Sequence, residues 1–229
     1  MSKLQWDKTG EHFYETGVDH GVLFPMNANR QTYGKGVAWN GLTAVTESPE
    51  GAELTALYAD NIKYLNLMSA EEFKATIEAY TYPEEFEACD GSAELGAGIK
   101  VTQQPRLPFA FCYRTKVGND LNPEAGYKIH IIYGCTAQPS ERAYETVNDS
   151  PDAITFSWEV ATVPVECEGF KPTAHIEIDS TKVDSAVLAQ IEAKLYGVDA
   201  DPEHSIEGSD PELLMPNDII EILNPQEAG

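Results

Sequence analysis

Two short stretches of the chain are apolar at nearly every position: Leu-Pro-Phe-Ala-Phe-Cys-Tyr at 107–113 and Tyr-Lys-Ile-His-Ile-Ile-Tyr at 127–133. Strands have this composition when both of their faces are covered, so we expect these two at the centre of a sheet. Around them, apolar residues fall on every second position at 73–79, 154–160 and 174–178. A period of two predicts strands that bury one face.

Turn signals separate these strands, among them Ser-Pro-Glu-Gly at 48–51 and Asn-Pro at 122–123. Many short strands with few helical periods predict a mainly β fold, an antiparallel β-sandwich or partial β-barrel. One flanking α-helix is expected at 184–196, where Asp184 can serve as N-cap and Gly197 can end the helix.

The last part of the chain differs in composition, because residues 198–229 contain nine acidic residues and no Lys or Arg. We therefore divide the chain into a β domain, 1–197, and an acidic C-terminal arm, 198–229. The arm is expected to carry a short helix at about 217–223, capped by Asn217. So few apolar groups cannot form a core, and the arm is expected to be disordered or docked.

The chain of 229 residues has 38 acidic and 15 basic residues, a formal net charge of −23. This charge disfavours a protein that reads nucleic acid and one that binds an anionic membrane surface. The apolar fraction of 42% still supports a buried core. The first residues lack an apolar signal segment, and the four cysteines lack the spacing of a zinc site, so we expect a cytosolic protein with reduced, mostly buried thiols.

Motifs for chemistry are almost absent from the sequence. It contains no Gly-x-Ser-x-Gly elbow, no phosphate loop and no His-x-x-x-His pair. His130 and His175 fall on predicted strands and are interpreted as structural. A glycosidase-like carboxylate pair is the remaining enzymatic hypothesis, with Glu78 and Glu159 as its best candidates. We expect no enzyme, no catalytic residue, no cofactor and no metal site, and instead a protein that acts through its surfaces.

Several blocks of sequence, in order over residues 4–197, resemble the major tail tube proteins of long-tailed phages that infect Gram-positive bacteria. At the C-terminal end, 213–220 is also similar to that family, although Glu212 stands where a basic residue is more common. The blocks are YETGVDHGVLFP at 14–25, GVAWNGL at 36–42, LYADNIKY at 57–64, ATIEAYTYP at 75–83, CYRT at 112–115, ITFSWEV at 154–160 and IDSTKV at 178–183.

The resemblance implies two packed antiparallel sheets with a flanking helix. It implies that six copies form a ring, that rings stack into a hollow tail tube around a tape-measure protein, and that the tube conducts double-stranded DNA during ejection without binding it specifically. The implied partners are further copies of the chain, the tape-measure protein, and the tail terminator and distal tail proteins, with no membrane. The implied location is the virion tail, and the host cytoplasm during assembly.

Within this hypothesis, physical arguments assign roles to particular residues. An acidic loop at 47–59 is predicted to bridge stacked rings, with Pro49 and Gly51 at its tip. Acids on the polar faces of apolar strands are predicted to face the lumen, and the N-terminal segment or the C-terminal arm is predicted to dock on a neighbouring subunit. The residues are Glu47, Pro49, Glu50, Gly51 and Glu53 for the loop, Glu78 and Glu159 for the lumen, and Trp6, Phe13, Tyr14, Ile219, Ile220 and Leu223 for docking.

The sequence is also compatible with two other classes of function. One is an Ig-like adhesion or decoration module that binds a sugar or a protein. The other is a carboxylate-dependent hydrolase, which would need an acid in an apolar pocket. Particle size separates these classes, because only the tube hypothesis predicts rings or tubes of the purified protein.

Overall fold

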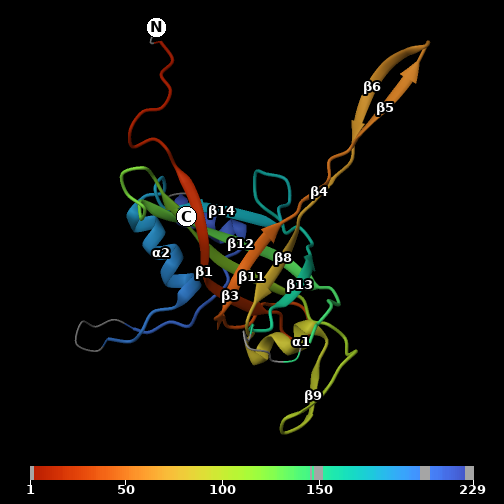
Figure 1. Ribbon diagram of the computed structural model, residues 1–229, viewed down its shortest axis with the longest axis vertical. Helices are drawn as coiled ribbons and strands as arrows, with labels where there is room; N and C mark the ends of the chain where they lie inside the picture. The colour runs from red at the N-terminus through yellow and green to blue at the C-terminus, as the bar shows by residue number, and fades with distance from the viewer. Residues whose placement is uncertain (1–2, 145, 147–151, 202–206, 225–229) are drawn as a thin grey trace.

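The computed structural model describes residues 3–144, 146, 152–201 and 207–224. Its body is one antiparallel sheet with the strand order β2-β1-β11-β12-β13-β8-β3, in which β14 also pairs with β12 (Figure 1). The prediction of a mainly β, antiparallel fold is confirmed. The strands of this sheet are β1 (Tyr14–Pro25), β2 (Val37–Trp39), β3 (Leu42–Glu47), β8 (Lys74–Ala79), β11 (Phe109–Gly118), β12 (Gly126–Ala137), β13 (Phe156–Ala161) and β14 (His175–Asp179).

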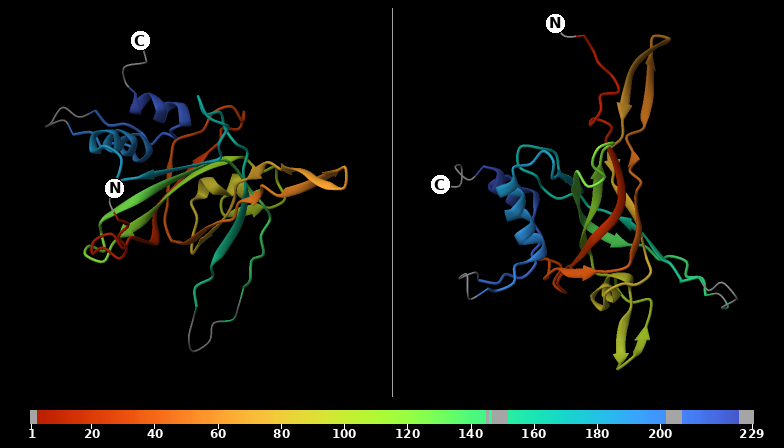
Figure 2. Two further views of the ribbon diagram at one scale, coloured as in Figure 1. Left: turned by 90° about the horizontal axis from the view of Figure 1, so that it is seen from above. Right: turned by 60° about the vertical axis from the view of Figure 1, so that its left-hand side comes forward.

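The remaining elements are short strand pairs and helices. Two strand pairs, β4 with β7 and β5 with β6, follow one another in a long hairpin, and β9 with β10 form a second hairpin. Both hairpins project from the body (Figures 1 and 2). The bounds are β4 (Glu50–Gly51), β5 (Leu54–Ala59), β6 (Ile62–Met68), β7 (Glu71–Glu72), β9 (Ala93–Gly96), β10 (Ile99–Val101), the 3-10 helix η1 (Glu84–Phe86), α1 (Glu87–Asp90), α2 (Ser185–Tyr196) and α3 (Pro216–Leu223).

The two central strands are the ones that the sequence predicts. β11 and β12 pair with each other, with Cys112 opposite Ile131, and both of these side chains are fully buried. Near its end, β12 turns at Gly134, whose φ is +59°. The strand pairs with β14 before this residue and with β13 after it. The sheet is thereby divided into two halves that share β12.

The main core lies between these halves. The alternating residues of β8 and β13 point into it, as their period of two predicts, and Ile77 and Trp158 are fully buried. Trp158 packs edge-on against Trp39 and Phe86, with ring centroids 5.5 and 5.1 Å apart. Aromatic rings bury large apolar areas, so this cluster holds the two halves together.

A second core lies between the outer face of the β1-β11-β12-β14 half and the helices. Leu188, Ile191 and Leu195 of α2 pack there against buried residues of β12. The Asp184 carboxylate accepts hydrogen bonds from the backbone N–H groups of Ala186 and Val187, which confirms the predicted N-cap. The protein is therefore built in three layers, with two sheet halves and one layer of helices (Figure 2).

The C-terminal helix differs from its prediction in detail. α3 begins at Pro216 with Met215 as N-cap, so the prediction that Asn217 caps the helix was wrong. Pro is favoured at the first helical position because its missing N–H would have no partner there. The Asn217 side chain instead accepts a hydrogen bond from the Glu168 N–H at 2.9 Å. The Tyr133 hydroxyl donates to the carbonyl of Leu214 at 2.9 Å, which ties the chain ahead of α3 to the sheet.

Two further properties follow from the described residues. Cys89, Cys112 and Cys135 are buried free thiols, as predicted, and burial raises the pKa of Cys89 and of Cys112 to about 12.

Within the described ranges, no helix has both the length and the apolar composition needed to span a membrane. Residues 202–206 and 225–229 of the predicted acidic arm lie outside the described residues.

Candidate functional site

The most prominent feature of the surface is the long hairpin formed by residues 48–72, which we call the hairpin arm (Figures 1 and 2). β4 pairs with β7 at its base and β5 pairs with β6 along its outer part. The tip is the dipeptide Asp60-Asn61, with φ values of +51° and +63°. Asp and Asn tolerate the left-handed conformation that tight hairpin turns require.

The predicted bridging loop at 47–59 is therefore one leg of this arm. The prediction that Pro49 and Gly51 form its tip was wrong, because β6 returns along β5 and moves the turn out to 60–61. Pro49 and Gly51 lie at the base of the arm. The Lys74 ammonium donates a hydrogen bond to the Glu50 carboxylate at 2.6 Å. One of the acids predicted to bridge rings therefore forms an ion pair within the chain, at the base of the arm.

The outer part of the arm is apolar on both faces. Leu57 lies opposite Leu65, and Leu54 lies opposite Met68. Residues an odd number of positions apart point to opposite faces of a strand, so these two pairs cover different faces. Tyr58 is 72% exposed and Leu54 is 60% exposed. A two-stranded hairpin is marginally stable alone, and apolar patches of this kind mark interaction sites.

Glu78 and Glu159, the predicted lumen residues, lie on neighbouring strands and on the same face of the sheet. Glu78 pairs with Ser157, and Glu159 pairs with Thr76. The intervening residues point into the core, so this polar face points away from it. Glu159 is exposed and Glu78 is half-buried. The arrangement is an open strand face, unlike the apolar pocket that a carboxylate hydrolase requires.

The predicted docking residues lie near the two ends of the chain. Trp6 and Phe13 are 74% and 61% exposed, and Tyr14 is also exposed. In α3, Ile219 is buried against the chain's own second core and Ile220 is half-buried. The apolar face of α3 uses Ile222, which packs on this core, while Leu223 is exposed.

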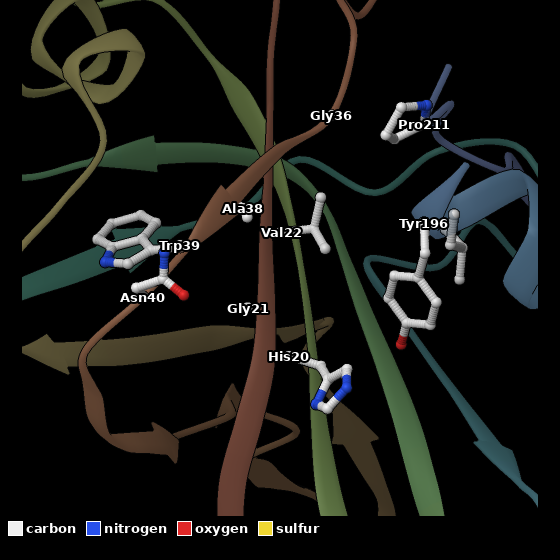
Figure 3. Close-up of a pocket in the computed structure, with 10 residues that line it drawn as sticks. His20, Gly21, Val22, Gly36, Ala38, Trp39, Asn40, Tyr196 and Pro211 are labelled. Atoms are coloured by element: carbon white, nitrogen blue, oxygen red, sulfur yellow. The ribbon is translucent and has the colours of Figure 1, made fainter. Parts of the chain in front are cut away.

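A cavity of about 350 Å³ lies between β1, β2 and the end of α2 (Figure 3). His20, Val22 and Trp39 line one side, and Tyr196 and Pro211 line the other. Neither Glu78 nor Glu159 lines this cavity. It offers an imidazole and a phenol as titratable groups, with ring centroids 6.0 Å apart, and no carboxylate pair.

A cluster of three side chains that the sequence did not identify lies at the root of the hairpin arm. Glu47, the last residue of β3, meets His130 of β12 and His175 of β14. Burial lowers the pKa of both imidazoles, and for His130 the neighbouring His175 lowers it further, although Glu47 opposes this change. Both rings are therefore neutral near pH 7. Burial also raises the pKa of Tyr113, whose hydroxyl donates to Glu47 at 2.6 Å.

In comparisons with known proteins, this chain is similar to solved structures only. No protein-family model matches the chain, and no curated protein matches it. A chain of the six-fold symmetrised baseplate of the anti-feeding prophage is 8% identical, with a TM-score of 0.37, and the alignment covers 79% of this chain and 100% of that one. A chain of the SPP1 tail tube is 11% identical, with a TM-score of 0.38 and coverage of 87% and 96%.

These two structures are parts of a prophage baseplate and of a phage tail tube. TM-scores below 0.5 do not establish a common fold.

Proposed function

We propose that this chain is a structural subunit of a phage tail tube. Copies form hexameric rings, the rings stack into a hollow tube, and the tube conducts DNA during ejection. The observation that carries this proposal is the hairpin arm, because it exposes apolar side chains on both faces and projects away from the body. Such an element is stable when another protein covers it. The ordered sequence resemblance over residues 4–197 supports a second copy of the chain as that protein.

The sheet offers the means of ring formation. β2 and β3 end the strand order, so each presents an edge. Unpaired edges tend to pair with another strand, and closure into a shared barrel removes them. The half formed by β13, β8 and β3 would supply the inner wall, with its polar face toward the lumen.

In this arrangement, Glu78 and Glu159 line the channel. Their negative charge repels the phosphates of passing DNA and prevents it from adhering. Screening limits the effect to about 8 Å at physiological salt. The acids on the channel wall therefore matter more than the total charge of −23.

The hairpin arm is assigned to the contact between stacked rings. About ten residues of extended chain from Glu50 to the tip reach roughly 33 Å, well beyond the base where Pro49, Glu50, Gly51 and Glu53 lie. Trp6, Phe13, Tyr14, Ile220 and Leu223 remain candidates for docking on neighbours. The tape-measure, tail terminator and distal tail proteins complete the proposed partners in the virion tail.

Self-assembly of the purified, untagged chain tests this proposal. The wild-type protein should form rings or tubes in negative-stain images, and its sedimentation should depend on concentration. Leu65→Glu places a charge on the arm and should prevent stacking. Leu121→Glu makes the same change on an exposed leucine outside the arm, 68% exposed, and should assemble normally. A monodisperse wild-type monomer at high concentration would contradict the proposal.

A second experiment tests the lumen assignment in assembled phage. Changing Glu78 and Glu159 together to Lys should leave the tubes intact and slow DNA ejection, because lysines bind phosphate. The matched control changes Glu124 and Glu141, both exposed elsewhere on the surface, to Lys. Normal tubes with unchanged ejection would refute the lumen positions while leaving the tube itself in place.

A further inference from the structure

We propose that Glu47, His130 and His175 form a binding site for a divalent transition metal, with Zn²⁺ as the best fit, at the root of the hairpin arm. Two imidazole nitrogens and one carboxylate oxygen are the donor set of many zinc sites. The site rests on the geometry of these side chains and does not depend on the proposed function.

The distances between the donor atoms match tetrahedral coordination. His130 Nδ1 lies 3.2 Å from His175 Nε2. Glu47 Oε1 lies 3.5 Å from the first nitrogen and 3.6 Å from the second. Zinc–ligand bonds of 2.0–2.1 Å give an edge of about 3.3–3.4 Å for a tetrahedron, but only about 2.9 Å between neighbouring ligands of an octahedron. The three atoms therefore resemble one face of a tetrahedron.

Neighbouring groups hold the donors in position. Thr115 Oγ1 lies 3.1 Å from His130 Nε2. A hydrogen bond donated from Nε2 to this hydroxyl leaves the Nδ1 lone pair free, as is usual for histidines that bind metals. The Tyr113 ring stacks on His130 at 4.6 Å with an interplanar angle of 5°. The Phe73 ring stacks on His175 at 4.8 Å. The rings are therefore preorganised for a common ligand.

The site is enclosed and still reachable from solvent. The side chain of His130 is 6% exposed, that of His175 is 19% exposed and that of Glu47 is 35% exposed. A metal can enter beside Glu47, and a water molecule can fill the fourth coordination position.

A bound metal would join the outgoing leg of the arm, through Glu47, to the opposite half of the sheet, where the returning leg contacts His175 through the ring of Phe73. Glu47 is the last residue before the outgoing leg, and Phe73 follows directly after the returning leg. His130 and His175 lie on β12 and β14. The metal would fix the direction in which the arm leaves the body, because it links the arm's root to strands of the central layer.

Metal binding by the full chain, purified without a polyhistidine tag and treated with a chelator, tests the proposal. Titration with Co²⁺ should give the visible absorption of tetrahedral coordination with one equivalent bound, and Zn²⁺ should displace it. Binding to the native state alone should raise Tm by roughly 5–10 °C at a hundredfold excess over Kd.

Two variants and two matched controls make the test specific. His175→Gln and Glu47→Gln should each abolish the spectrum and the Tm shift. His20→Gln and Glu72→Gln remove one histidine and one nearby acid outside the group and should change neither. If His175→Gln fails to fold, Glu47→Gln decides the question. Absence of one-to-one binding by the wild-type chain, or binding that persists in a folded Glu47→Gln variant, would overturn the proposal.

Discussion

The guanidinium of Arg114 contacts the carboxylate of Asp19 through two nitrogens, with Nε to Oδ1 at 2.8 Å and Nη2 to Oδ2 at 3.3 Å. The two residues are opposite each other in the β1–β11 pair, between two shifts of register. Gly17 and His20, which flank Asp19, have positive φ values that let β1 change register there. A bidentate ion pair is geometrically specific, so it fixes the alignment of β1 at a place where backbone pairing alone does not.

This pair should contribute to stability in a pH-dependent way. Partial burial raises the pKa of Asp19, but the hydrogen bond and charge of Arg114, together with His20, outweigh it and lower the pKa below 3.8. The folded state therefore gains stability above pH 4 and loses it as the pH falls through the folded-state pKa. Asp19→Asn should lower the free energy of unfolding by up to about 1 kcal/mol at pH 7. Urea titrations should show the difference from wild type shrinking below pH 4, and a constant difference would contradict this origin.

The two core tryptophans should respond differently to replacement by Phe. Trp39 Nε1 donates to the Thr81 carbonyl at 2.8 Å. Trp158 Nε1 is buried and has no hydrogen-bond partner among the described residues. Trp39→Phe loses volume and a hydrogen bond, whereas Trp158→Phe loses volume and removes an unsatisfied donor. We expect Trp39→Phe to be less stable than Trp158→Phe by about 1 kcal/mol in chemical denaturation. The reverse order would indicate that Trp158 Nε1 has a partner such as water.

Gly134 and Gly98 provide a matched test of the turn in β12. Both have positive φ, +59° and +75°. A Cβ at Gly98 would meet nothing within 4 Å, while a Cβ at Gly134 would clash with the backbone carbonyl oxygen of Val163. Gly98→Ala should cost about 1 kcal/mol of stability through backbone strain alone. Gly134→Ala should cost several times more, because the backbone around Val163 must move. Equal losses in thermal unfolding would mean that the sheet adapts at this point.

The cap of α2 offers a smaller, well-defined effect. Asp184→Ala removes the acceptor for the N–H groups of Ala186 and Val187. The expected loss is about 1 kcal/mol of stability. Asp184→Asn retains a side-chain acceptor and should stay close to wild type in the same denaturation experiment. A loss as large for Asn as for Ala would point to the charge of Asp184 rather than to its hydrogen bonds.

The parts of the fold that the sequence predicted are those with a local pattern. β11 and β12 are apolar on both faces because they lie between two cores, and that composition is visible without a structure. The cap of α2 depends on neighbouring residues and was equally visible. The tip of the hairpin arm was misplaced because Pro49 and Gly51 are stronger turn formers than Asp60-Asn61, and only the pairing of β5 with β6 shows that the chain turns at 60–61.

The cluster of side chains at the root of the hairpin arm could not be predicted from the spacing of residues along the sequence. Glu47, His130 and His175 are far apart in sequence and meet through the topology of the sheet. His175 is opposite Ile132 in the β12–β14 pair, which places it diagonally next to His130 on the same face. Glu47 approaches from the other half of the sheet. Contacts across such distances depend on strand order, which a single sequence does not encode locally.

The sharing of β12 has a consequence for how the chain folds. β12 pairs with β11 and β14 in one half of the sheet and with β13 in the other. If either half lost its hydrogen bonds to β12, it would expose β12, which is also paired in the other half. We therefore expect the body to unfold as one cooperative unit, with amides around β12 that exchange with solvent through global opening. The hairpin arm, which adds few contacts to that unit, can open and close on its own without unfolding the body.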